Sequence, residues 1–113
     1  MGRKRENLGN FELMVLLALM RVRDDAYGLP ILQEIESRIG REVSLGSVYA
    51  ALARLEIKGF VTSRLGEPTA ERGGKAKRYF KVTSSGVREV RDVRRALASL
   101  WQGLSQTTRG AIA

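Results

Sequence analysis

The chain has 113 residues, which is enough for one domain with a modest core. Its 20 Lys and Arg residues outnumber its 12 Asp and Glu residues, and the net charge of +8 favours a polyanionic partner, with nucleic acid ahead of a membrane surface. The sequence contains no Cys and no His, which excludes a disulfide framework and a thiolate zinc site and removes the commonest general base. We therefore expect no enzyme, no metal and no cofactor, with an enzyme built on carboxylates as a distant alternative.

The N-terminal part of the chain combines a basic segment with an apolar helix. Residues 1–7 predict a flexible basic arm, and Asn10 can cap a helix over residues 11–21. This helix is apolar on nearly every side, so it should be sandwiched between its own domain and a second surface. Its longest apolar run, residues 13–20, is far shorter than the roughly 20 residues of a membrane span, and no signal-peptide cleavage site follows it. We expect a cytoplasmic protein that does not enter a membrane.

Two further helices are predicted next along the chain. The first covers about residues 27–39, with Pro30 tolerated in its first turn and Gly40 as its end. The second covers residues 45–58 and is capped by Ser44. Two short helices joined by such a turn are typical of a helix-turn-helix.

The helix over residues 45–58 has two different faces. At about 100° per residue, Val48, Leu52 and Leu55 fall on one side, which predicts their burial. The opposite side carries the small residues Gly46, Ser47, Ala50 and Ala53 rather than the Lys and Glu of a solvated face, together with Arg54 and with Tyr49 at its margin. A major groove about 12 Å wide admits a helix closely only where the side chains are short, so this face predicts contact with duplex DNA. An alanine-rich surface helix without a partner is the alternative.

Residues 60–65 and 78–83 predict the two strands of a hairpin, and the segment between them is basic. Its cations lie beside the pair Gly73 and Gly74 and are Arg72, Lys75, Lys77 and Arg78. They predict a wing that reaches DNA phosphates or a neighbouring minor groove. An ordinary solvated hairpin is the alternative, because Glu67 and Glu71 lie in the same segment.

The last predicted helix, residues 84–106 after a Thr83 cap, carries an apolar stripe along a length of about 35 Å. The stripe consists of Val87, Val90, Val93, Leu97, Leu100, Trp101 and Leu104. A small domain cannot cover this length by itself, so the stripe predicts a dimer interface that also includes Leu13 and Leu17 of the first helix. The alternative is a helix folded back on its own domain. Trp101 is expected either to anchor the interface or to stack against a planar effector.

Three segments, AYGLPILQEI, LGSVYAALARLEIKGFVTSR and ERGGKAKRYFKVTSSG, resemble in this order the PadR family of bacterial transcriptional regulators over about residues 8–90. The resemblance implies a winged helix-turn-helix that represses transcription as a homodimer and is often relieved by a small effector. It implies that residues 45–58 form the recognition helix. The residues that match the family's motifs are Tyr49, Arg54, Leu55, Glu56, Gly59, Gly73, Gly74, Lys75, Lys77, Arg78, Tyr79 and Phe80.

The chain departs from the family pattern at positions 50 and 80. Ala50 follows Tyr49 where family members commonly have a Pro soon after the tyrosine, so the docking angle or the base contacts can differ. Phe80 replaces the second tyrosine of the wing and is expected to pack inward. Ile57 lies on the outward side of the recognition helix. Contact with the wing or the hinge is the only explanation for an apolar residue at this position.

Together these patterns predict a mainly α protein with a small β-hairpin: a winged helix-turn-helix over residues 8–83, a dimerisation helix over residues 84–106 and a disordered tail over residues 107–113. We expect a homodimer that binds an inverted-repeat operator in duplex DNA. The expected DNA-contacting residues are Ser44, Gly46, Ser47, Tyr49, Ala50, Arg54, Tyr27, Arg72, Lys75, Lys77 and Arg78. Arg54 is the best donor for a guanine edge, although it can instead pair with an acid or a phosphate. A protein–protein adaptor and an architectural or RNA-binding protein without sequence preference are the alternatives.

Overall fold

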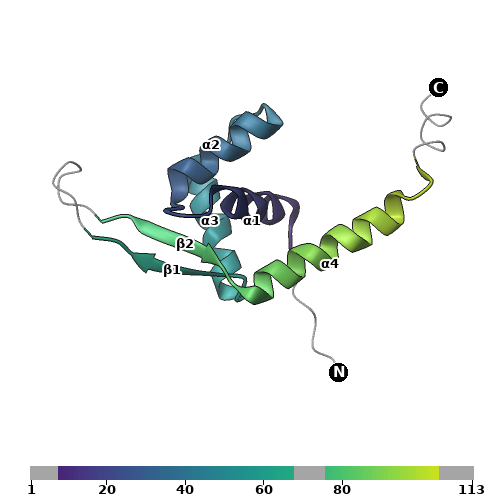
Figure 1. Cartoon of the computed structure of the whole chain (residues 1–113). Coiled ribbons are helices and arrows are strands. Elements are labelled where there is room, and N and C mark those ends of the chain that lie inside the picture. The colour runs from purple at the N-terminus through teal and green to yellow at the C-terminus, as the bar shows by residue number, and fades with distance from the viewer. Residues whose placement is uncertain (1–7, 68–75, 105–113) are drawn as a thin grey trace.

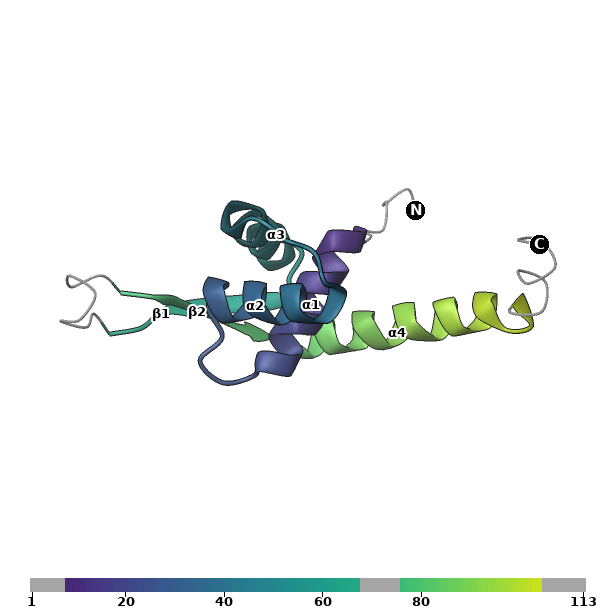
Figure 2. The same ribbon diagram turned by 90° about the horizontal axis from the view of Figure 1, so that it is seen from above.

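The computed structural model describes residues 8–67 and 76–104, over which helices and a hairpin follow one another as the sequence predicts (Figure 1). The elements are α1 (Asn10–Val22), α2 (Gly28–Ile39), α3 (Leu45–Ile57), β1 (Val61–Leu65), β2 (Arg78–Val82) and α4 (Ser84–Trp101). Helices α1 to α3 gather into one body, and the hairpin and α4 extend from it in opposite directions (Figures 1 and 2). The predicted fold class, a mainly helical winged helix-turn-helix with a long C-terminal helix, is confirmed.

The core lies where the three helices meet the base of the hairpin. Its fully buried members on α3 are Val48, Leu52 and Leu55, as their spacing predicts. Each such side chain contributes about 1.5–3 kcal/mol through its removal from water. The other large members come from α1, α2 and the hairpin, namely Val15, Leu16, Leu19, Ile31, Ile35, Phe60, Val61 and Phe80.

A backbone hydrogen bond ties the hairpin to this body. The strands are antiparallel, with Ser63 paired to Phe80, and Phe80 points inward as expected. The Phe80 N–H donates to the carbonyl of Ala26 in the α1–α2 turn at 2.8 Å. This bond fixes the direction in which the hairpin leaves the body.

The start of α4 is anchored to the end of α3. The Thr83 hydroxyl accepts the N–H of Gly86 at 3.0 Å, which confirms the predicted cap, and donates to the carbonyl of Gly59 at 2.7 Å. The Thr83 N–H donates to the Phe60 carbonyl at 3.0 Å. Gly86 lies so close to this carbonyl that a Cβ at position 86 would overlap its oxygen. The first turn of α4 is therefore held firmly before the helix leaves the body.

Two predicted helix ends were wrong. Gly9, not Asn10, caps α1, because the carboxylate of Glu12 accepts the Gly9 N–H at 3.1 Å and allows the helix to begin at Asn10. Helix α4 ends at Trp101 rather than near residue 106, since Gly103 adopts a left-handed φ of +77°. Its 18 residues span about 27 Å instead of 35 Å.

The predicted arm at residues 1–7 and tail at residues 107–113 lie outside the described residues. Among the helices that are described, none has the length and apolar character needed to cross a membrane.

Candidate nucleic-acid interface

The small-residue face of α3 points to solvent. Gly46, Ser47, Ala50 and Ala53 are exposed, and a Cβ added to Gly46 would meet no atom within 4 Å. These positions are opposite the buried Val48, Leu52 and Leu55. A partner molecule can therefore approach the backbone of α3 closely along this face.

Ser44 and Ser47 form the exposed N-terminus of α3. The Ser44 hydroxyl accepts the Ser47 N–H at 3.0 Å, so the predicted cap is confirmed, and it donates to the Ser47 hydroxyl at 2.7 Å. The Ser47 hydroxyl keeps its own hydrogen for an acceptor outside the helix. Together with the positive end of the helix dipole, this arrangement suits a phosphate oxygen.

Tyr49 has a packing role that the sequence did not reveal. Its ring lies 6.4 Å from that of Phe80, and Gly28 at the start of α2 faces its outer end so closely that a Cβ would overlap the ring. The side chain thus joins α3 to α2 and β2, while 39 % of the residue remains exposed. Contact of Tyr49 with DNA stays a prediction.

Arg54 pairs with an acid in the free protein, which was the open alternative to a guanine contact. Its Nε donates to the Glu12 carboxylate of α1 at 2.6 Å, and the Lys58 ammonium donates to the second oxygen of the same carboxylate at 2.7 Å. The side chain of Glu12 is only 8 % exposed, whereas that of Arg54 is 50 % exposed. Arg54 can therefore still reach an outside partner.

The environment of Glu12 keeps its carboxylate charged. Burial raises the pKa of this carboxyl, but hydrogen bonds from Lys58, Arg54 and the Gly9 N–H outweigh burial and lower the pKa from 4.5 to about 2. Sequence reasoning missed Glu12. The signal was available, because one acid inside the apolar segment FELMVLLALM needs a cationic partner when that segment is buried.

Aromatic and cationic side chains stack at the base of the wing. The Lys77 ammonium lies 4.3 Å from the centre of the Tyr27 ring, which meets the Tyr79 ring edge to face at 5.8 Å. The Arg64 guanidinium covers Tyr79 at 4.9 Å. Tyr27 is thus a packed aromatic at the entrance of α2, and its contact with DNA backbone stays a prediction.

Arg78, another cation of the predicted wing, belongs to a chain of polar contacts. Arg78 Nη1 donates to the Ser63 hydroxyl at 3.0 Å, which in turn donates to the Glu56 carboxylate of α3 at 2.9 Å. Arg78 is exposed, so it can also contact a phosphate. The predicted phosphate contacts Arg72 and Lys75 lie outside the described residues.

Ile57 is 85 % exposed, so the expected contact with the wing or the hinge covers little of this residue.

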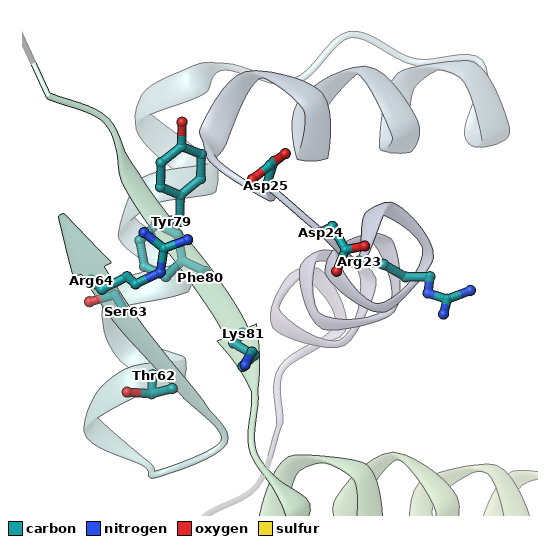
Figure 3. Close-up of a pocket in the computed structure, with 9 residues that line it drawn as sticks. All are labelled: Arg23, Asp24, Asp25, Thr62, Ser63, Arg64, Tyr79, Phe80 and Lys81. Atoms are coloured by element: carbon teal, nitrogen blue, oxygen red, sulfur yellow. The ribbon is translucent and has the colours of Figure 1, made fainter. Parts of the chain in front are cut away.

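A hollow of about 530 Å³ lies between the α1–α2 turn and the hairpin (Figure 3). Asp24 and Asp25 of the turn line one side, and Arg64, Tyr79 and Lys81 of the strands line the other. Acids and bases share this hollow, so it lacks the single sign of charge that attracts a nucleic acid.

An apolar groove of about 360 Å³ separates α1 from α4. It brings together six residues of the predicted dimer interface, namely Leu13, Leu17, Val90, Val93, Leu97 and Trp101. Val87 and Leu104 are half-buried outside its lining, and Leu100 is 74 % exposed. The alternative of a helix folded back on its own domain holds only for the first turns of α4, because Leu97, Leu100 and Trp101 are exposed.

No group of acids among residues 8–67 and 76–104 could hold a metal ion. The exposed face of α3 and the apolar groove between α1 and α4 are the two sites that bear on the predicted function.

Comparison with solved structures shows the same fold at low sequence identity. A PadR family transcriptional regulator from Eggerthella lenta is 24% identical with a TM-score of 0.68, over 84% of this chain and 80% of that one. A putative transcriptional regulator from Thermoplasma acidophilum is 20% identical with a TM-score of 0.69, over 86% and 91% of the two chains. A PadR-like transcription factor from Bacteroides fragilis is 24% identical with a TM-score of 0.66, over 91% and 89%.

Sequence comparison identifies the family. A search of curated proteins found no match. The sequence profile described as transcriptional regulator PadR-like family matches residues 16–92, which is more than half of the chain. The members of this family are transcriptional regulators that bind DNA, and they are not enzymes, in agreement with the prediction from the sequence. The chain belongs to the PadR-like family of transcriptional regulators.

Proposed function

We propose that the protein is a homodimeric repressor that binds duplex DNA with α3 in the major groove. The observation that carries this proposal is the exposed small face of α3, on which Gly46, Ser47 and Ala50 leave the helix backbone accessible. A helix about 10–12 Å in diameter fits a groove of about 12 Å only if such a face is turned to the bases. Repression, rather than activation, follows from the resemblance to the family.

The polar groups around α3 supply phosphate contacts in this arrangement. Ser44 and Ser47 hold a phosphate at the helix N-terminus, and Lys77 and Arg78 hold the backbone beside the wing, with Arg72 and Lys75 farther along the same loop. Few side chains on α3 carry several hydrogen-bond donors, so DNA shape contributes part of the sequence preference.

The dimer in this proposal forms through α4 and α1. The support is the apolar groove between them and the exposed Leu97, Leu100 and Trp101 at the free end of α4, which would otherwise stay in water. A two-fold dimer places two copies of α3 in successive major grooves about 34–36 Å apart, so the operator is an inverted repeat.

We also propose this groove as the binding site of the small effector that the resemblance implies. Trp101 is 61 % exposed and lines the groove together with Leu13 and Leu97, so a planar apolar molecule can stack on the indole ring. Such a molecule would act by changing how the second copy packs against α4.

Selection of bound duplexes from a random pool with the purified protein tests the proposal. We expect an enriched palindrome, with half-sites about one helical turn apart. Enrichment without a common sequence would favour an architectural binder, and no enrichment would favour a protein–protein adaptor; either result overturns the proposal.

A pair of variants then tests the role of α3. Ala50→Glu adds a carboxylate to the exposed face and should abolish binding to the selected duplex, because the carboxylate would lie against bases and phosphates. Ser99→Glu adds the same charge to the exposed, polar side of α4 and should leave binding nearly unchanged. Equal affinities for the two variants would remove α3 from the interface.

A further inference from the structure

Glu12 is a buried acid on α1 that reaches two cations, Arg54 in the last turn of α3 and Lys58 at its C-terminal cap. One carboxylate oxygen accepts from Arg54 Nε at 2.6 Å, and the other accepts from Lys58 Nζ at 2.7 Å. Arg54 and Lys58 are four residues apart, so they lie one turn apart on the same side of α3. Two bonds to one carboxylate fix both the rotation and the position of α3 relative to α1.

The same side of α3 continues into the exposed face. Ser47 and Ala50 precede Arg54 by seven and four residues, so the three share one row of the helix. The row is open to solvent at Ser47 and Ala50 and ends against α1 at Lys58, whose side chain is only 14 % exposed. Arg54 lies at the boundary, where its half-exposed side chain faces both Glu12 and the outside.

The chemistry of the guanidinium allows two partners at once. Arginine has five N–H donors, and the bond through Nε leaves the terminal nitrogens with donors for a second acceptor. A guanidinium held on one edge by a carboxylate is already ordered before a partner arrives, so less side-chain freedom is lost on binding. Bases that present two acceptors in the major groove, as guanine does with O6 and N7, are the best match for such a donor pair.

We propose that Glu12 is a positioning residue for DNA recognition, which holds the guanidinium of Arg54 so that its terminal nitrogens face the major groove. Glu12 itself is buried and touches no base. This inference rests on the proposed placement of α3 in the groove and adds to it the residue that sets the direction of the arginine. Lys58 shares the carboxylate but belongs to the buried side of the contact.

The contrast between the two cations supplies a matched control. Glu12→Gln keeps the size of the side chain, removes its charge and leaves one acceptor oxygen for the two cations that now bind two oxygens. Lys58→Met removes the buried partner of the same carboxylate and leaves the Arg54–Glu12 bond in place. A role in stability alone would be shared by both variants, whereas the orientation of Arg54 is weakened only in the first.

The experiment measures the preference ratio, the affinity for the selected duplex divided by that for a scrambled duplex, together with the melting temperature of each variant. Arg54→Ala should lower the ratio about tenfold, the range of one base contact. Glu12→Gln should lower it by a comparable factor in the wild-type background and by nothing further in the Arg54→Ala background. Lys58→Met should lower the melting temperature and leave the ratio unchanged.

Three results would overturn the inference: an unchanged ratio in Glu12→Gln, a full effect of Glu12→Gln in the absence of Arg54, or an unchanged ratio in Arg54→Ala. None of these results touches the proposed function, which fails instead if Ala50→Glu binds the selected duplex normally.

A measurement on the wild type needs no substitution and covers the case in which Glu12→Gln does not fold. By NMR relaxation, the Arg54 Nε–H group should be as rigid as the backbone of α3 in the free protein. It should remain rigid when the protein binds the selected duplex. A mobile Arg54 side chain in the free protein would contradict the inference.

Discussion

Gly28→Ala should destabilise the protein by forcing Tyr49 away from α2. A Cβ at position 28 would lie 2.5 Å from Oη and 2.6 Å from Cε2 of Tyr49, whereas ordinary contacts of a Cβ lie at 3.4–4 Å. The end of the ring must therefore retreat by about 1 Å. Phe80 limits this movement on the side of the hairpin, because its ring is buried 6.4 Å from that of Tyr49.

The expected cost follows from two opposing effects. Overpacking at a well-filled contact costs about 1–3 kcal/mol. The higher helix propensity of Ala offsets at most about 1 kcal/mol, and less at the first position of α2. A net loss of about 1–2 kcal/mol corresponds to a fall in melting temperature of roughly 5–10 °C for a domain of this size.

Thermal unfolding followed by circular dichroism measures this loss in wild type, Gly28→Ala, Tyr49→Leu and the double variant. The penalty of Gly28→Ala should vanish in the Tyr49→Leu background, since Leu lacks the atoms that would clash. Gly46→Ala is the matched control, because nothing lies within 4 Å of a Cβ there, and its melting temperature should be unchanged or higher. An unaltered melting temperature for Gly28→Ala, or an equal penalty in both backgrounds, would refute the reasoning.

Three further predictions concern acid stability, salt dependence and assembly. The pKa of Glu12 is about 2 in the folded protein and 4.5 in the reference state, so its contribution of at most about 3 kcal/mol is present above pH 4.5 and lost as the pH falls towards 2. Urea unfolding should therefore show a difference between wild type and Glu12→Gln at pH 7 that shrinks by pH 3; a constant difference would contradict the pairing. Charge reversal at Lys75 and Lys77 should weaken binding to every duplex and reduce the slope of log affinity against log salt by about one for each lost phosphate contact, and an unchanged slope would remove the wing from the interface. Leu97→Glu should convert the proposed dimer to a monomer in sedimentation velocity without unfolding α1 to α3, and a dimer that persists would exclude α4 from the interface.

The sequence predicts α3 well because its determinants are local. Val48, Leu52 and Leu55 repeat at helical spacing, and all three are fully buried. Ser44 precedes this repeat and is the observed cap. The exposure of Gly46 and Ala50 follows, because a helix that buries one side presents the other.

The contacts that the sequence could not supply join residues distant along the chain. Glu12 and Arg54 are 42 positions apart, so no periodicity links them, although an isolated acid in an apolar helix indicates that some cation must be near. The approach of Tyr49 to Gly28 depends on how α2 and α3 cross, which neither helix determines alone. The end of α4 was misplaced for a related reason: the apolar spacing continues to Leu104, while the backbone turns at Gly103.

A single residue, Thr83, separates β2 from α4, and all three of its polar backbone or side-chain contacts described above go to the body or to the first turn of the helix. A flexible joint would need several residues with freely variable dihedral angles. This connection consists of one residue, which the contacts hold in place. In a dimer assembled through α4, a change in the angle between the two subunits would therefore reach each hairpin undiminished. The distance between the two wings, and with it the operator spacing that the protein tolerates, is then set by how the two C-terminal helices cross.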